Sequence, residues 1–144
     1  MYYFGYGINT NTAHMAARAK TATCLGKAHI NDYRFRFAYH ADIVPSIGDQ
    51  VDGVAWLITD HDLAELDILE GYPKYYTRIK QQVTVSGKCI DAWVYIMQPG
   101  PLDSVPGDYY YEMVVNGYNE HQVPLTQINI AMDVALKQHN NSNS

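Results

Sequence analysis

Apolar and polar residues alternate with a period of two in several segments of the chain, which predicts strands. The clearest case is 33–39, where four aromatic residues at odd positions are separated by Arg34, Arg36 and Ala38. Such alternation gives a sheet one apolar face. The expected strands are 2–5, 21–30, 33–39, 51–58, 76–85 and 89–97, with Asn31-Asp32 joining the second to the third and Ser86-Gly87 as a hairpin turn between the last two.

A helical period replaces this alternation from 60 to 69, where leucines recur at positions 63, 66 and 69. Thr59 or Asp60 is placed to cap the first turn, and Gly71 ends the helix. Prolines and glycines predict loops at 41–50 and 98–107. The other expected helices are 13–20, capped by Thr10 or Thr12, then 109–121, weakened by Gly117, and 124–137, with Pro124 just inside its first turn.

The order of these elements is mixed rather than regularly alternating, which favours an α+β fold over a parallel α/β sheet. The length of 144 residues corresponds to one domain. We expect this domain to span 1–138 and to be followed by a disordered polar tail at 139–144.

Composition excludes several functional classes. A hydrophobic content of 47% with 17% charged residues predicts a compact fold rather than a disordered chain. The net charge of -5 and the scattered lysines and arginines argue against a nucleic-acid partner. No segment has the apolar length of a membrane span, and the first residues do not resemble a signal peptide. We therefore expect a soluble, cytoplasmic protein without a membrane partner.

Thirteen tyrosines against three phenylalanines are unusual. Because a buried tyrosine hydroxyl needs a partner, this ratio predicts a cavity lined by hydroxyls. Half-buried tyrosines on the sheet are the simpler alternative. Cys24 and Cys89 lie in strand-like runs, and we expect two buried free thiols rather than a disulfide. Neither cysteine has a histidine context that favours a nucleophile.

Glu70 is the leading candidate for acid/base chemistry. It lies between Leu69 and the helix-ending Gly71, and partial burial beside leucines raises the pKa of a carboxyl group toward neutrality. The alternative is an ordinary solvated glutamate in a last helical turn. Asp67, three residues earlier, is a second acidic candidate, although a position facing solvent or bonded to backbone is the simpler interpretation.

A glycine turn follows the first predicted strand, at Tyr6, Gly7, Ile8 and Asn9. Successive backbone N–H groups in such a turn can point at an anion. The alternative is that Asn9 only caps a helix or closes a side-chain turn. The six histidines are dispersed without metal-ligand spacing, and no nucleophile elbow or phosphate-loop lysine is present. We therefore expect chemistry without a cofactor or metal.

Four short motifs occur in order along the chain and carry a resemblance. They are Tyr6-Gly7-Ile8-Asn9, the Gly-x-x-Val-x-Gly segment 48–53, the Leu-Asp-x-x-Glu-Gly segment 66–71, and the Tyr-x-Arg segment 76–78. In this register and spacing they resemble the γ-glutamylcyclotransferase-like family, which includes γ-glutamylamine cyclotransferases and AIG2-like plant proteins. The similarity continues through 92–95 and Tyr110 to 125, and so covers nearly the whole chain.

The resemblance implies a small mixed β-barrel flanked by helices, with one cavity and no metal or nucleotide. It implies that the first loop binds the α-carboxylate of a γ-glutamyl group through backbone N–H donors. Glu70 then takes a proton from the α-amine as that nitrogen attacks the γ-carbonyl, and returns it to the departing amine to leave 5-oxoproline. Tyr110 is a further expected cavity hydroxyl, and Arg78 is expected to pair structurally with a carboxylate.

Ile8 departs from the family pattern, which has serine at that position. If only backbone N–H groups bind the substrate, little is lost. If the missing hydroxyl orients the substrate, its loss costs about 1–3 kcal/mol. The segment 70–73, followed by two tyrosines, resembles the γ-glutamylamine branch.

The expected substrate is a γ-glutamyl amine or γ-glutamyl amino-acid conjugate. The alternatives are a non-catalytic small-ligand-binding protein of the same fold and an enzyme acting on another amide, such as an acyl-antibiotic intermediate. The leaving amine and the oligomeric state stay open.

Overall fold

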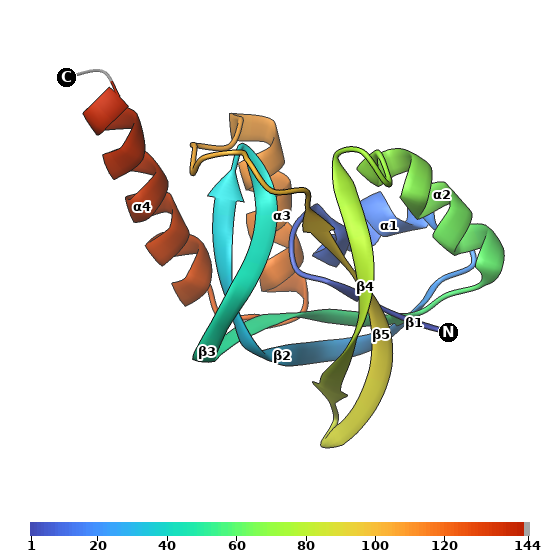
Figure 1. The fold of residues 1–144 in the computed structure, drawn as a ribbon. Coiled ribbons are helices and arrows are strands. Elements are labelled where there is room, and N and C mark those ends of the chain that lie inside the picture. The colour runs from blue at the N-terminus through green and yellow to red at the C-terminus, as the bar shows by residue number, and fades with distance from the viewer. Residues whose placement is uncertain (143–144) are drawn as a thin grey trace.

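A computed structural model describes residues 1–142 and shows a strand-rich body with helices around it (Figure 1). Five strands and four α-helices occur in this part of the chain, together with one short 3-10 helix, η1. The elements in chain order are β1 (Tyr2–Gly5), η1 (Ile8–Thr10), α1 (Thr12–Arg18), β2 (Thr23–Ala38), β3 (His40–Leu57), α2 (Asp60–Glu70), β4 (Tyr76–Val85), β5 (Lys88–Met97), α3 (Asp108–Glu120) and α4 (Thr126–Ser142).

The strands form a closed barrel in the order β1-β3-β2-β4-β5. The barrel is mixed, since β1 runs antiparallel to β3 but parallel to β5 and closes the sheet between them. The helices lie outside the barrel, with α1 and α2 at one side and α3 and α4 toward the other (Figure 1). The predicted α+β class with a small mixed barrel flanked by helices is confirmed.

Two predictions about the first half of the chain are wrong. Residues 21–39 do not form two strands, because β2 continues past Asn31-Asp32 through a register shift that accommodates Asp32 at a φ of 65°. The predicted loop at 41–50 belongs to β3. Pro45 is tolerated there because β1 pairs with β3 only at Val54 to Leu57, so near Pro45 the strand has β2 as its neighbour and one free edge.

The β4–β5 hairpin has the predicted strands and turn. The predicted helix at 60–69 is also confirmed, and its ends explain why. Thr59 and Asp62 form a reciprocal capping box at the N-terminus. Gly71 adopts the left-handed conformation, with a φ of 66°, at the C-terminus. Local residues therefore determine where Glu70 lies, in the last turn of α2.

The other helices differ from prediction at their N-termini. Asn11, rather than Thr10 or Thr12, caps α1, because its side chain accepts the His14 N–H at 3.0 Å. Pro124 precedes α4 and is not inside its first turn, since this helix begins at Thr126. The same helix continues to Ser142, so the predicted tail is helical up to that residue, and the rest of it lies outside the described residues.

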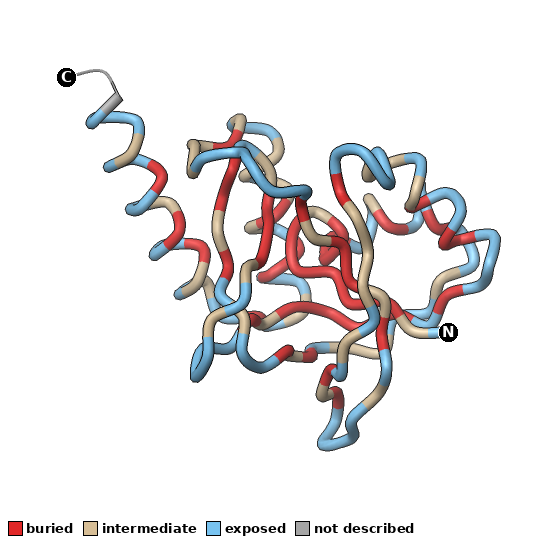
Figure 2. Tube along the Cα trace, viewed as in Figure 1, coloured by how far each residue is buried: buried red, intermediate tan, exposed pale blue. Residues whose placement is uncertain are grey.

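Buried residues concentrate inside the barrel and under α3 (Figure 2). The expectation of buried thiols is wrong, because Cys24 and Cys89 are both free and both exposed. Within residues 1–142, no helix combines the length and hydropathy that crossing a bilayer requires.

Candidate active site

A pocket of about 190 Å³ opens where the first loop, the end of α2 and α3 meet the barrel. Six of the described lining residues are tyrosines, which agrees with the predicted hydroxyl-lined cavity. The predicted acid/base residue Glu70 lines this pocket, as do all the predicted substrate-binding residues: Tyr6, Gly7, Ile8, Asn9 and Tyr110. The lining comprises Tyr3, Tyr6, Gly7, Ile8, Asn9, His14, His40, Ala41, Leu69, Glu70, Tyr75, Tyr76, Tyr95 and Tyr110.

Glu70 is half-buried as a residue, but its carboxyl group lies within the pocket. Desolvation raises the pKa of this group from 4.5 to about 7, and a hydrogen bond from Asn9 acts in the opposite direction. The Asn9 side-chain nitrogen donates to Glu70 Oε1 at 2.9 Å and to the Tyr3 hydroxyl at 2.7 Å. The carboxyl group is thus held in one orientation and is half ionised near neutral pH.

The carbonyl groups of the first loop already accept hydrogen bonds from other parts of the protein. Tyr118 donates its hydroxyl to the Tyr6 carbonyl at 2.6 Å, and the Trp56 indole donates to the Asn9 carbonyl at 3.0 Å. The Gly7 carbonyl accepts from the backbone and side chain of Thr10. These contacts hold the turn from β1 into η1 in place.

The N–H groups of the same turn have a different environment. The first N–H groups of a helical turn have no partner inside it. Within residues 1–142, the N–H groups of Gly7, Ile8 and Asn9 bond no backbone carbonyl. The Ile8 N–H instead faces the Tyr110 hydroxyl. Gly7, Ile8 and Asn9 all line the pocket, and the N–H groups of successive residues in such a turn suit an anion such as a carboxylate.

Tyr110 comes from α3 and lines the pocket beside the first loop. Its hydroxyl accepts the Ala41 N–H at 3.0 Å, while Tyr76 donates its own hydroxyl to the Ala41 carbonyl at 2.5 Å. Burial raises the pKa of both phenols well above 10, so both stay protonated. The Tyr110 proton is therefore available to a group in the pocket.

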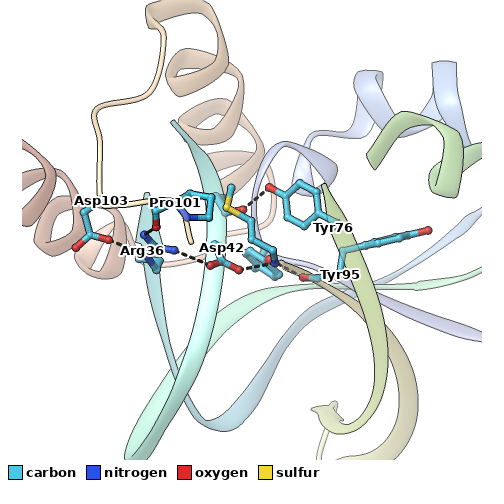
Figure 3. Close-up of polar contacts among 9 residues, drawn as sticks. Arg36, Asp42, Tyr76, Tyr95, Pro101 and Asp103 are labelled. Atoms are coloured by element: carbon cyan, nitrogen blue, oxygen red, sulfur yellow. Dashed lines mark hydrogen bonds and ion pairs between the residues drawn. The ribbon is translucent and has the colours of Figure 1, made fainter. Parts of the chain in front are cut away.

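A partly buried ion-pair network supports the strands that carry Ala41 and Tyr76. Arg36 lies between Asp42 and Asp103 and also bonds the Pro101 carbonyl (Figure 3). Asp42 in turn accepts the Met97 N–H at 2.9 Å and so connects β3 to β5. Figure 3 shows Tyr76 and Tyr95 on the strands beside this network. Ala41, which orients Tyr110 and Tyr76, immediately precedes Asp42 and is positioned by it.

A second ion pair anchors the end of α2. Arg78 donates to both Asp67 oxygens, at 2.9 and 3.2 Å, and Tyr95 donates its hydroxyl to the same carboxylate at 2.7 Å. The structural role expected for Arg78 is confirmed. The simpler interpretation of Asp67 as solvent-facing or backbone-bonded is wrong, because the hairpin brings β4 and β5 against the last turn of the helix. Asp67 therefore positions Glu70 and does not pair with it.

Several pocket residues could not be identified from the sequence. For Tyr3 the sequence offered only the strand pattern around it, and for His14 it offered no indication of a place in the pocket. The dispersed histidines do not indicate His40, yet it packs edge-on against Tyr110, with ring centroids 4.9 Å apart, and its Nδ1 lies 2.7 Å from the Tyr75 hydroxyl. Burial lowers the pKa of His40 and of His14, which favours neutral imidazoles at the pocket.

A closed mixed barrel with a glutamate facing a turn of backbone donors defines a class of small β-barrel enzymes. The chain belongs to the gamma-glutamyl cyclotransferase, AIG2-like family, whose model matches residues 3–124. The resemblance read from the motifs and the expectation of an enzyme are both confirmed.

Individual relatives agree with this assignment. A gamma-glutamylcyclotransferase from Bos taurus is 32% identical over 139 residues, covering 85% of this chain and 72% of the relative. The Homo sapiens gamma-glutamylcyclotransferase is 30% identical with the same coverage. A solved structure described as a gamma-glutamyl cyclotransferase superposes with a TM-score of 0.82 at 26% identity, covering 93% of this chain and 87% of that one.

Proposed function

We propose that the protein is a cyclotransferase that releases 5-oxoproline from a γ-glutamyl amine or γ-glutamyl amino-acid conjugate. The observation that carries this proposal is that Glu70, with a pKa of about 7, shares one pocket with the backbone donors of Gly7 to Asn9. An acid/base with a pKa near the working pH is suited to moving one proton in both directions.

Binding begins with the substrate's α-carboxylate. The described pocket lining includes no lysine or arginine, so the negative charge has to be met by neutral donors. The N–H groups of Gly7, Ile8 and Asn9 are placed to do this. Ile8 keeps the backbone donor of that position while lacking the serine hydroxyl, and it lines the pocket.

The chemical step is intramolecular. Ionised Glu70 removes a proton from the substrate's α-amine as that nitrogen attacks the γ-carbonyl carbon. The C–N bond to the leaving amine then breaks, Glu70 returns the proton to that amine, and a five-membered lactam remains. Holding the γ-glutamyl chain bent supplies much of the rate, because effective molarities of well-oriented groups are high.

The phenols supply the remaining polar contacts. Tyr110 and Tyr3 lie on the pocket wall and stay protonated because burial raises the pKa of each. Each hydroxyl already accepts a hydrogen bond, Tyr110 from Ala41 and Tyr3 from Asn9, so each has a proton left to donate. Such a donor stabilises negative charge as it develops on the γ-carbonyl oxygen.

The test is release of 5-oxoproline from a panel of γ-glutamyl amines and γ-glutamyl amino acids. Glu70→Gln is expected to lower the rate of 5-oxoproline release at least about 100-fold and to leave the circular dichroism spectrum unchanged. Glu65→Gln is the matched control, because Glu65 lies exposed on the same helix. Full activity in Glu70→Gln would refute the mechanism.

The same panel tests the alternative of a non-catalytic binding protein. That alternative rests on Ile8 in place of the family's serine. Saturable binding of γ-glutamyl compounds without any release of 5-oxoproline would support it and refute the enzyme. The Bos taurus and Homo sapiens relatives are named gamma-glutamylcyclotransferases, so γ-glutamyl amino acids belong in the first panel.

A further inference from the structure

Cys24 and His121 form a pair on the surface, outside the pocket. Cys24 Sγ lies 3.9 Å from His121 Nδ1, although the two residues are 97 positions apart in the chain. The expectation that neither cysteine has a histidine partner is therefore wrong for Cys24. The fold creates this pair by placing the end of α3 against the start of β2.

The His121 ring is held in one orientation. Its Nε2 lies 3.1 Å from the Thr12 hydroxyl, and the ring stands edge-on to Trp56, with centroids 6.0 Å apart at 80°. The His121 backbone N–H bonds the Gly117 carbonyl at the end of α3. When the Thr12 hydroxyl accepts a hydrogen bond from Nε2, the lone pair of Nδ1 faces the thiol.

The thiol is also accessible. The β2–β3 register shifts between Cys24 and Gly26, and Gly26 has a φ of 104°. Such a bulge redirects the side chains next to it. Cys24 is exposed, whereas Trp56, its partner across the strands, is buried. A small reagent can therefore reach the sulfur while the base beside it stays ordered.

We propose that Cys24 is a nucleophilic thiol, with His121 as its general base and Thr12 as the group that orients the base. An exposed thiol with an adjacent base and a third orienting group has the arrangement of an activated nucleophile. This site is independent of the cyclotransferase proposal. Its reactants are small disulfides and soft alkylating electrophiles.

The exchange reaction with a small disulfide is balanced without a further oxidant. The Cys24 proton passes to His121 Nδ1 as Sγ attacks one sulfur of the disulfide. The S–S bond of the reagent breaks, a bond between Cys24 and that sulfur forms, and the other half leaves as a thiolate. The thiolate then takes the proton from His121.

Cys89 provides an internal control for this proposal. It is also exposed and also lies in a strand, but the Thr84 hydroxyl, rather than a histidine, lies 3.9 Å from its sulfur. The experiment treats the 144-residue protein with iodoacetamide at neutral pH and follows the Cys24 and Cys89 peptides by mass spectrometry. We expect Cys24 to react at least about 10-fold faster than Cys89.

Variants separate activation by His121 from mere exposure. His121→Phe retains an aromatic ring next to Trp56 and is expected to lower the Cys24 rate to that of Cys89. Thr12→Val is expected to lower it about 3-fold, and His61→Phe, an exposed substitution on α2, is expected to change neither rate. A circular dichroism spectrum matching that of the unsubstituted protein reports that each variant is folded, and an unchanged Cys89 rate shows that the reagent acts equally in each sample. Equal rates for the two cysteines in the unsubstituted protein, or a Cys24 rate that survives His121→Phe, would overturn the proposal.

A second readout uses hydroxyethyl disulfide, which is uncharged and carries no γ-glutamyl group. A mixed disulfide at Cys24 that dithiothreitol reverses, with little at Cys89, is the expected result. Equal labelling of both cysteines would contradict the assignment. Neither experiment depends on 5-oxoproline release, so the failure of one proposal leaves the other testable.

Discussion

The side-chain amide of Asn9 donates a hydrogen bond to the Glu70 carboxylate over 2.9 Å, across 61 positions of sequence. The same nitrogen donates to the Tyr3 hydroxyl, so one residue connects β1, the first loop and the end of α2. Burial raises the pKa of Glu70, while this hydrogen bond favours its charged form. The balance between the two effects places the pKa of the acid near neutrality.

The first prediction concerns pH. Because the mechanism needs ionised Glu70, kcat/KM is expected to rise with pH through a midpoint of about 7 and then level off. The measurement is initial rates of 5-oxoproline release at several pH values on both sides of the midpoint. A separate titration of the substrate's α-amine is the control for the part of the rate profile above the midpoint. A midpoint near the ordinary glutamate value would contradict the role of burial.

The second prediction separates the contribution of Asn9. Asn9→Leu removes the donor to Glu70 and leaves burial in place, so the pKa of Glu70 rises further and the midpoint of the rate profile moves to higher pH. Activity should therefore fall more at pH 6 than at pH 8. Tyr3→Phe is the matched control, because it removes the acceptor of the other Asn9 hydrogen and keeps the Glu70 contact. If the rate profiles of both variants have the same midpoint as that of the unsubstituted protein, Asn9 does not affect the pKa of Glu70.

The third prediction concerns the contact between α3 and the first loop. A Cβ added at Gly117 would lie 2.2 Å from Thr10 Oγ1 and 2.7 Å from the Asn11 nitrogen. Gly117→Ala is therefore expected to displace η1, to destabilise the fold by about 1–3 kcal/mol in urea titrations and to lower kcat/KM. Asn116→Ala, on the exposed face of the same helix, should leave both unchanged. If the Gly117→Ala protein is as stable and as active as the unsubstituted protein, the close approach of α3 to η1 is not required.

The fourth prediction addresses the departure at Ile8. Ile8→Ser restores a hydroxyl donor while keeping the backbone N–H of the turn. One additional hydrogen bond to the substrate contributes about 0.5–1.5 kcal/mol, so KM is expected to fall about 2- to 10-fold with little change in kcat. Ile8→Val is the control for reduced side-chain volume without a hydroxyl. A gain in kcat from Ile8→Ser would instead assign the hydroxyl to the chemical step.

Local interactions account for the parts of the fold that could be predicted from the chain alone. The capping box at Thr59, the left-handed Gly71 and the turn at Ser86-Gly87 depend on neighbours within a few residues, so their positions follow from sequence. The motifs around Gly7 and Glu70 could likewise be read, and the family comparison confirmed the resemblance that they carry. The position of Glu70 at the end of a helix is a local property of this chain.

Contacts between residues far apart in the sequence determined the features of the fold and of the pocket that could not be predicted from the chain alone. Pro45 reads as a loop residue, but the open edge of β3 accommodates it in a strand. Asn9, Tyr110 and His40 become pocket residues only when barrel closure brings β1, β3 and α3 together, and Cys24 meets His121 for the same reason. Gly117 reads as a weak point of a helix, yet it permits the approach of η1. Such relationships depend on which surfaces pack against each other, and residue spacing along the chain carries no direct record of that packing.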